Sequence, residues 1–190
     1  NIQEFLRTYQ RWSSLSGKSI QWDVLELWSF SGRFSFTAFP NGVSVGPPIV
    51  DRYGWHLALP SHQRLISKEV FKPRVVLAAP ECTRWSISNN RADPSELQAL
   101  QNSQEPMLSW LVEITRIQIE CNRGIIIDNP SRSAIWTKSP LLVLLTSGEI
   151  TQKKCSQCAF GAIHRASKKA VRKVTIFASN LASEGTFHPA

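Results

Sequence analysis

The sequence predicts an α/β domain in which a mostly parallel sheet carries helices on both faces. Short apolar runs typical of buried strands recur along the chain, and helical patterns with short connections separate them. The runs lie at residues 24–28, 46–51, 74–78 and 125–127. Continuous apolar strands alternating with helices are typical of parallel sheets that are covered on both sides.

Helical patterns are expected at residues 2–15, 33–39, 60–70, 95–121 and 139–145, and late strands at 149–152 and 174–178. In the first pattern Phe5, Leu6, Tyr9 and Trp12 recur near helical spacing. A chain of 190 residues is long enough for one domain with its own core. We therefore expect a single domain (1–190), with an N-terminal helix (1–20), a core (21–180) and a tail (181–190).

The composition is that of a globular protein, with 42% hydrophobic and 19% charged residues. The longest apolar runs, such as Leu141–Leu145, are too short to span a bilayer, and Asn1–Gln10 shows no signal-peptide pattern. Four cysteines do not make a disulfide framework in a chain of this length, so we expect an intracellular, reducing compartment. Cys155 and Cys158 form only half of a zinc site, so no metal is expected.

The chain is strongly basic, with a net charge of +8 and a pI of about 9.7. Much of the excess is local, in Lys153, Lys154, Arg165, Lys168, Lys169, Arg172 and Lys173. Such clustering suits a polyanion, most simply nucleic acid. A solvated basic loop or an acidic protein partner would produce the same pattern.

Two strand-like runs are followed by side chains that could take part in catalysis. The run at 75–77 leads through Pro80 to Cys82, and the run at 125–127 leads to Asp128. Sites in open α/β sheets lie at the carboxyl ends of strands, where a thiol is a candidate nucleophile. The alternatives are a half-buried structural thiol and an acid that serves a turn or caps a helix.

Five segments, taken in order, resemble the motifs of the cytosine-5 DNA methyltransferase family, and most closely its compact phage-like or environmental members. They are the cofactor motif at 24–33, the ribose-binding motif at 48–55, the nucleophile loop at 79–86, the segment at 127–130, and the late segments 158–161 with 172–177. The resemblance runs from about residue 24 to residue 180. It implies a Rossmann-like S-adenosylmethionine-dependent methyltransferase fold.

The resemblance also implies roles for individual residues. Cys82 would be the nucleophile that adds to C6 of a flipped cytosine, and Asp128 the acid that holds the base. The S-adenosylmethionine site would be lined by Glu26, Ser31, Gly32 and Asp51. The nucleic acid (DNA, or RNA) would be contacted by Arg84, Trp85, Lys168, Lys169, Arg172 and Lys173, with Trp85 and Trp136 placed to stack on a base.

Four residues depart from the family pattern, one of which is His56, where compact members usually have an acid after Gly-Trp. Phe30 stands where the family has its first glycine, Glu81 replaces the second proline of the nucleophile loop, and Asp128 is one methylene shorter than the family's glutamate. A phenyl ring at position 30 would fill space that the cofactor needs. A second hypothesis is therefore a catalytically inactive methyltransferase fold, acting as a structural or nucleic-acid-contacting subunit of a larger assembly.

Overall fold

The computed structural model describes residues 22–28, 33–47, 49–51, 54–67, 72–86, 93–156, 163, 166–170 and 173–181. The expected N-terminal helix, at 1–20, lies outside these residues, and so does the tail beyond Leu181. No helix in the described ranges combines the length and apolar character needed to cross a membrane.

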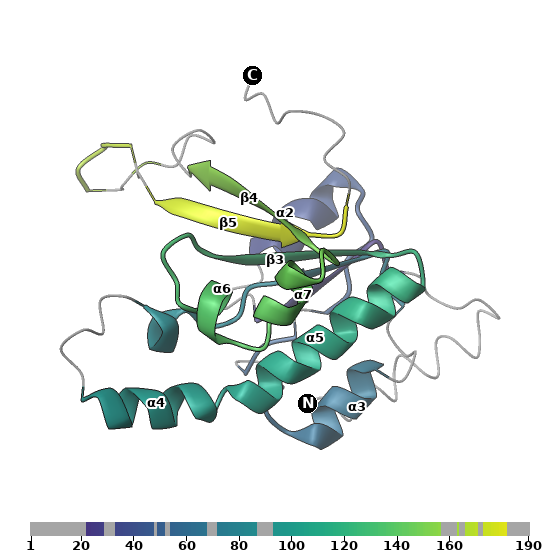
Figure 1. Cartoon of the computed structure of the whole chain (residues 1–190). Coiled ribbons are helices and arrows are strands. Elements are labelled where there is room, and N and C mark those ends of the chain that lie inside the picture. The colour runs from purple at the N-terminus through teal and green to yellow at the C-terminus, as the bar shows by residue number, and fades with distance from the viewer. Residues whose placement is uncertain are drawn as a thin grey trace.

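The described core contains a five-stranded sheet in the order β1-β2-β3-β5-β4. The strands are β1 (Val24–Leu27), β2 (Val75–Ala78), β3 (Gly124–Pro130), β4 (Thr151–Ser156) and β5 (Val174–Ser179). The first three run parallel, and β5 lies antiparallel between β3 and β4. β4 therefore points the same way as β3, and the predicted mostly parallel α/β architecture is confirmed (Figure 1).

The sequence pattern predicts a late strand at 174–178 but not its reversed direction. A parallel neighbour requires a long crossover connection, whereas an antiparallel one needs only a chain that doubles back. In the connection between β4 and β5, Ile163 and Ala170 pair in an antiparallel bridge, which is the geometry of a returning chain.

Within the described part of the expected strand at 46–51, one isolated parallel bridge beside β1 is found, at Ile49, and a second lies just before it, at Val45. Ile49 still donates to the carbonyl of Glu26 at 2.9 Å and accepts from the amide of Trp28 at 3.0 Å. Residues 47 and 48 are both prolines, which have no N–H to donate to a ladder. The segment therefore follows the edge of the sheet without forming a continuous strand.

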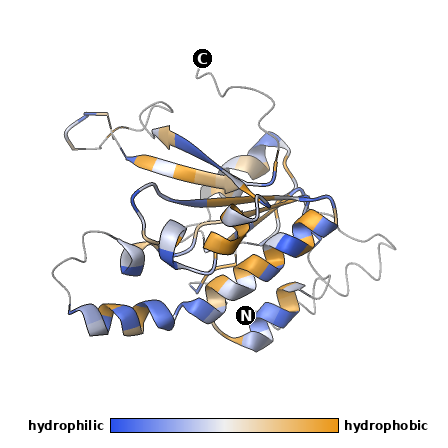
Figure 2. Ribbon diagram, viewed as in Figure 1, coloured by the Kyte–Doolittle hydropathy of each residue, from blue (hydrophilic) through white to orange (hydrophobic). Residues whose placement is uncertain are grey.

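Helices cover both faces of the sheet (Figure 1). α2 (Arg33–Ala38) lies on one side, and α3 (Pro60–Ser67), α5 (Glu105–Glu120), α6 (Ile135–Lys138) and α7 (Leu142–Thr146) lie on the other. The short helix α6 was not anticipated from the sequence. α4 (Pro94–Asn102) extends from the body and buries none of its residues, consistent with its mostly hydrophilic colouring in Figure 2.

The single helix expected at 95–121 is two helices, α4 and α5, separated at Ser103 and Gln104. Asp93 caps the start of α4, where its carboxylate accepts from the amide of Ser95 at 2.8 Å. Pro106 lies in the first turn of α5, the one helical position where a missing N–H costs nothing. Leu100 and Met107, on either side of the break, are about two helical turns apart, so the two apolar patterns are in register and predicted one helix.

The core lies between the sheet and the α5 side of the molecule. Alternate residues of the three parallel strands pack in one buried cluster with α5: Leu25, Leu27, Val76, Ala78, Ile125, Ile127, Leu108, Leu111 and Ile114. Figure 2 shows hydrophobic residues on the central strands and along α5. A rigid core at this position fixes the carboxyl ends of β2 and β3 beside each other.

Candidate active site

The structure brings the loop after β2 next to the end of β3. The two strands are parallel neighbours with Ala78 opposite Ile127, so Pro80 and Cys82 leave the sheet beside residues 128–130. The buried amide of Asn129 donates to the carbonyl oxygen of Pro80 at 2.8 Å. This bond fastens the loop that carries Cys82 to the strand that carries Asp128.

Cys82 is half-buried and forms no disulfide. It precedes a short 3-10 turn at Thr83–Trp85, and its carbonyl accepts from the amide of Trp85 at 3.1 Å. The carboxylate of the adjacent Glu81 accepts from Gln104 Nε2 at 3.2 Å and lies 4.0 Å from Nε of Arg84. The Glu81 carboxylate is thus directed toward polar partners on neighbouring segments.

Asp128 has the most unusual environment of the described carboxylates. Its Oδ1 is buried and has no hydrogen-bond partner. Burial raises the pKa of the Asp128 carboxyl, and the nearby positive charge of Lys173 opposes this shift. A carboxyl with a raised pKa remains protonated to higher pH, and in that form it can donate a hydrogen bond.

Two residues that sequence reasoning did not assign hold this region together. Gln104 is 6% exposed; it accepts from the indole N–H of Trp85 at 2.6 Å while donating to Glu81. Asn129 lay inside a recognised motif segment, which is the signal that would have identified it. No sequence pattern marks Gln104, because its role depends on the break between α4 and α5.

The prediction that Trp85 and Trp136 stack on a base is wrong. Trp85 is 1% exposed and Trp136 is 4% exposed, so neither ring offers a face to a ligand. The indole N–H of Trp136 donates to the carbonyl of Pro130 at 3.0 Å. Both rings pack in the core beneath the site, where their N–H groups find acceptors, as buried indoles usually do.

Arg84, which is predicted to contact nucleic acid, already forms a side-chain hydrogen bond within the protein. Its Nη1 donates to Ser103 Oγ at 2.8 Å, and its backbone carbonyl accepts from Gln101 Nε2 at 3.1 Å. Its side chain is 35% exposed. The described contacts of Arg84 therefore join the turn after Cys82 to the end of α4.

The residues expected to line the cofactor site differ in their surroundings. Glu26 is buried, and its Oε2 accepts from the amide of Ser35 at 3.0 Å and from its hydroxyl at 2.6 Å. These bonds hold the first turn of α2, so the described contacts of Glu26 are those of an acid that caps the next helix. Asp51 is 79% exposed, with His56 Nδ1 at 3.6 Å. Ser31 and Gly32 lie outside the described residues, as does Phe30.

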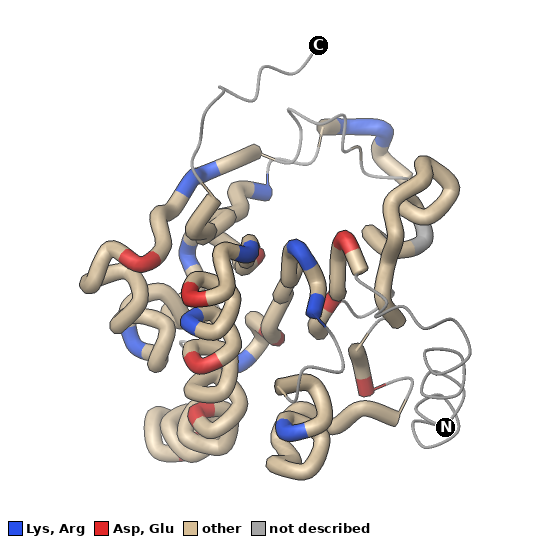
Figure 3. Tube along the Cα trace, turned by 90° about the vertical axis from the view of Figure 1, so that its right-hand side faces the viewer, with Lys and Arg blue, Asp and Glu red and all other residues tan. Residues whose placement is uncertain are grey.

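Exposed basic side chains gather near β4 and β5. Lys154, Lys168, Lys169 and Lys173 are exposed, whereas Arg172 lies outside the described residues. Figure 3 shows Lys and Arg at the top of the molecule, at the height of the β4–β5 connection, with the acidic segments lower down. Within the described ranges no three His, Cys, Asp or Glu side chains are grouped to hold a metal ion.

No protein-family model and no curated protein matches this chain. Among solved structures, the chain is similar to the Dnmt2 methyltransferase of S. pombe, with a TM-score of 0.44 and 12% sequence identity. The match covers 88% of this chain and 52% of that one, so the chain spans about half the length of the solved structure.

Proposed function

We propose that this chain is a methyltransferase-like domain that transfers a methyl group from S-adenosylmethionine to C5 of cytosine in nucleic acid. The observation that supports this most strongly is the Asp128 carboxyl, whose Oδ1 is buried without a partner beside the loop that carries Cys82. A carboxyl whose pKa is raised by burial, on the strand next to the loop of a half-buried thiol, matches the requirements of this reaction.

The chemistry assigns each residue a defined step. The Cys82 thiolate forms a bond to C6 of the flipped cytosine, and the ring electrons move toward N3 and C5. In its protonated form, which burial favours, the carboxyl of Asp128 donates a hydrogen bond to N3 and stabilises the negative charge that develops there. Bound S-adenosylmethionine would supply the methyl group to C5, and its sulfonium–methyl bond would break to leave S-adenosylhomocysteine. Loss of the C5 proton to a base and cleavage of the sulfur–C6 bond restore the thiolate and release 5-methylcytosine.

The described residues fit the cofactor in part. The exposed carboxylate of Asp51 follows the segment beside β1 and suits a sugar diol, which needs an acceptor. Glu26 would act indirectly, by fixing the start of α2 through Ser35. When bound, S-adenosylmethionine supplies an electrophilic methyl group on a sulfonium.

The exposed lysines support a nucleic-acid substrate. Lys168 and Lys169 lie in the connection that leads to β5, and Lys173 lies close enough to Asp128 to affect its pKa. Lysines at these positions would hold phosphates while a base enters the site. We propose DNA as the substrate, with RNA as the alternative polymer.

A second candidate function is an inactive methyltransferase-like domain that binds nucleic acid within a larger assembly. Two observations favour it. The Glu26 carboxylate is committed to Ser35, and an acidic residue, Glu81, replaces proline directly before Cys82. This candidate requires the basic surface and the core, but neither the thiol nor the cofactor site.

The two candidates are separated by trapping with oligonucleotides that contain 5-fluorocytosine, in the presence of S-adenosylmethionine. Fluorine cannot leave C5 as a proton does, so an active site remains joined to the base, and mass spectrometry locates the adduct. We expect an adduct on Cys82, none in Cys82→Ser, and an unchanged yield in the matched control Cys121→Ser.

Calorimetry with S-adenosylmethionine, on the natural chain and on Phe30→Gly, completes the test. Binding by both proteins together with adduct formation supports the enzyme. Nucleic-acid binding without an adduct, with cofactor binding only in Phe30→Gly, rejects the enzyme and supports the inactive domain.

A further inference from the structure

A cavity of about 390 Å³ lies between α3 and α5, over the face of the sheet. Lys72 and Pro73 precede β2, and Arg123 precedes β3, so the cavity opens where these strands begin. Cys82 and Asp128 lie toward the other ends of the same strands. The cavity is therefore a feature separate from the candidate active site.

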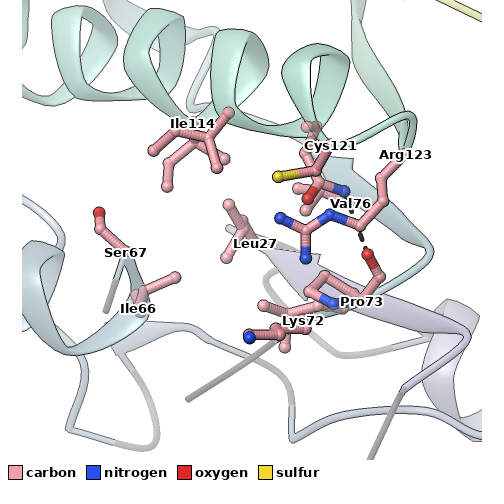
Figure 4. Close-up of a pocket in the computed structure, with 12 residues that line it drawn as sticks. Leu27, Ile66, Ser67, Lys72, Pro73, Val76, Ile114, Cys121 and Arg123 are labelled. Atoms are coloured by element: carbon pink, nitrogen blue, oxygen red, sulfur yellow. Dashed lines mark hydrogen bonds between the residues drawn. The ribbon is translucent and has the colours of Figure 1, made fainter. Parts of the chain in front are cut away.

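The cavity is apolar over most of its surface and cationic at one end (Figure 4). Its apolar lining comes from three strand residues and three helix residues: Leu25, Leu27, Val76, Ile66, Ile114 and Ile117. Lys72 and Arg123 are the two cations among its lining residues, and none of those residues is acidic. An occupant that matches this lining has an apolar body and one negatively charged end.

The guanidinium of Arg123 lies at the cationic end of the cavity. Its Nε is buried and has no hydrogen-bond partner. The nearby carbonyls of Pro73 and Gly124 already accept from Gln118 Nε2, at 3.3 and 2.9 Å. A buried charged donor without an acceptor is costly, and a carboxylate is the group whose geometry matches a guanidinium best.

We propose that this cavity binds an amphipathic monoanion, in which a single carboxylate is joined to an apolar chain or ring. The carboxylate pairs with Arg123, and the apolar part lies against Leu27 and Ile114. The volume is within the range of pockets that hold small molecules. The site requires neither the cofactor nor nucleic acid, so it does not depend on the proposed methyl transfer.

Cys121 lines the same cavity and is exposed, which provides a direct readout. The test uses decanoate as the probe and measures the rate of alkylation of Cys121 by iodoacetamide, peptide by peptide, in the mass spectrometer. Cys155 lies on β4, away from the cavity lining, and serves as an internal control in each sample. We expect decanoate to slow alkylation of Cys121 and to leave that of Cys155 unchanged.

Variants test the role of the charge. Arg123→Met keeps an unbranched side chain but removes the guanidinium, and should weaken decanoate protection roughly tenfold or more, the loss expected for a charge-assisted hydrogen bond. Arg74→Met is the matched control, because Arg74 is 68% exposed and does not line the cavity. Ile117→Phe, which places a larger side chain in the cavity, should abolish protection of Cys121 by decanoate. This second variant keeps the proposal testable should Arg123→Met fail to fold.

Three results would overturn the proposal. They are no protection of Cys121 by decanoate, equal protection in Arg123→Met, and protection by decanol as strong as by decanoate. The last two would show that apolar contact alone accounts for binding. The alkylation assay contains no nucleic acid and no S-adenosylmethionine. Its result for the cavity is therefore independent of the result of the 5-fluorocytosine adduct experiment.

Discussion

The side-chain amide of Asn129 donates a hydrogen bond to the backbone carbonyl of Pro80, with 2.8 Å between nitrogen and oxygen. Asn129 is 2% exposed, so this bond is shielded from water. It joins β3 to the loop after β2, and therefore couples the position of Asp128 to that of Cys82. Residues 49 positions apart in the sequence are held together at the two strand ends.

Replacing Asn129 by Ala should destabilise the fold and loosen the site. The carbonyl of Pro80 would be left buried without a donor, which costs about 1–3 kcal/mol in the free energy of unfolding. Urea denaturation measures this loss, and the yield of the 5-fluorocytosine adduct should fall as well. Asn102→Ala on the exposed surface of α4 is the control, and should change stability by no more than about 0.5 kcal/mol. Equal stabilities of the two variants would contradict the structural role of Asn129.

Much of the sheet could be predicted from the sequence, because its signals are local. Runs such as 75–78 and 124–127 are short, apolar, rich in β-branched residues and bounded by turn residues, so their length and composition identify them as strands. Their adjacency followed from two rules: strands joined by a helix lie parallel, and consecutive strands tend to be neighbours in the sheet. The placement of Cys82 beside the Asp128 segment therefore followed from the sequence.

The remaining features depend on contacts between distant residues. The direction of β5 is set by its pairing with β3 and β4, and no residue within 174–179 encodes it. The stacking role assigned to Trp85 failed because an aromatic residue near a site looks the same in sequence whether it faces solvent or the core. Gln104, at the break between α4 and α5, provides the buried acceptor for the indole N–H of Trp85, whose ring packs in the core cluster.

Asp128 should make stability depend on pH in a direction opposite to that of an ordinary paired carboxylate. In the unfolded chain its pKa has the ordinary value of about 3.8, whereas burial raises its pKa in the folded protein, against the charge of Lys173. Between these two values the folded protein binds more protons than the unfolded chain, so stability is lost as the pH rises through the folded pKa. The stability of wild type minus that of Asp128→Asn should therefore fall across this window and then level off.

Asp93→Asn is the matched control for that measurement. Hydrogen bonds from the Ser95 side chain and from the backbone amides of Glu96 and Ser95 lower the pKa of Asp93. Its contribution is therefore present above the ordinary pKa and is lost as the pH falls, which gives the difference curve the opposite slope. Curves of the same sign for Asp128→Asn and Asp93→Asn, from urea titrations at each pH, would show that burial does not dominate at Asp128.

Trp85→Phe should lower stability without changing affinity for nucleic acid. The substitution keeps an aromatic ring in the core but leaves the buried Oε1 of Gln104 without its donor, at a cost of about 1–3 kcal/mol. Thermal or urea denaturation measures the first effect, and fluorescence anisotropy with a labelled oligonucleotide measures the second. A weakened oligonucleotide complex at unchanged stability would restore the stacking role that the burial of Trp85 contradicts.

The exposed lysines before β5 should determine how nucleic-acid binding responds to salt. If Lys168 and Lys169 each neutralise one phosphate, the double change to Gln should reduce the slope of log K against log salt by about 1.8 for duplex DNA and about 1.4 for a single strand. Lys138→Gln with Arg64→Gln removes the same charge from exposed positions on α6 and α3, and is the matched control. Binding measured across a salt series distinguishes the two pairs. An equal loss of slope in both would mean that net charge, and not this surface, attracts the polymer.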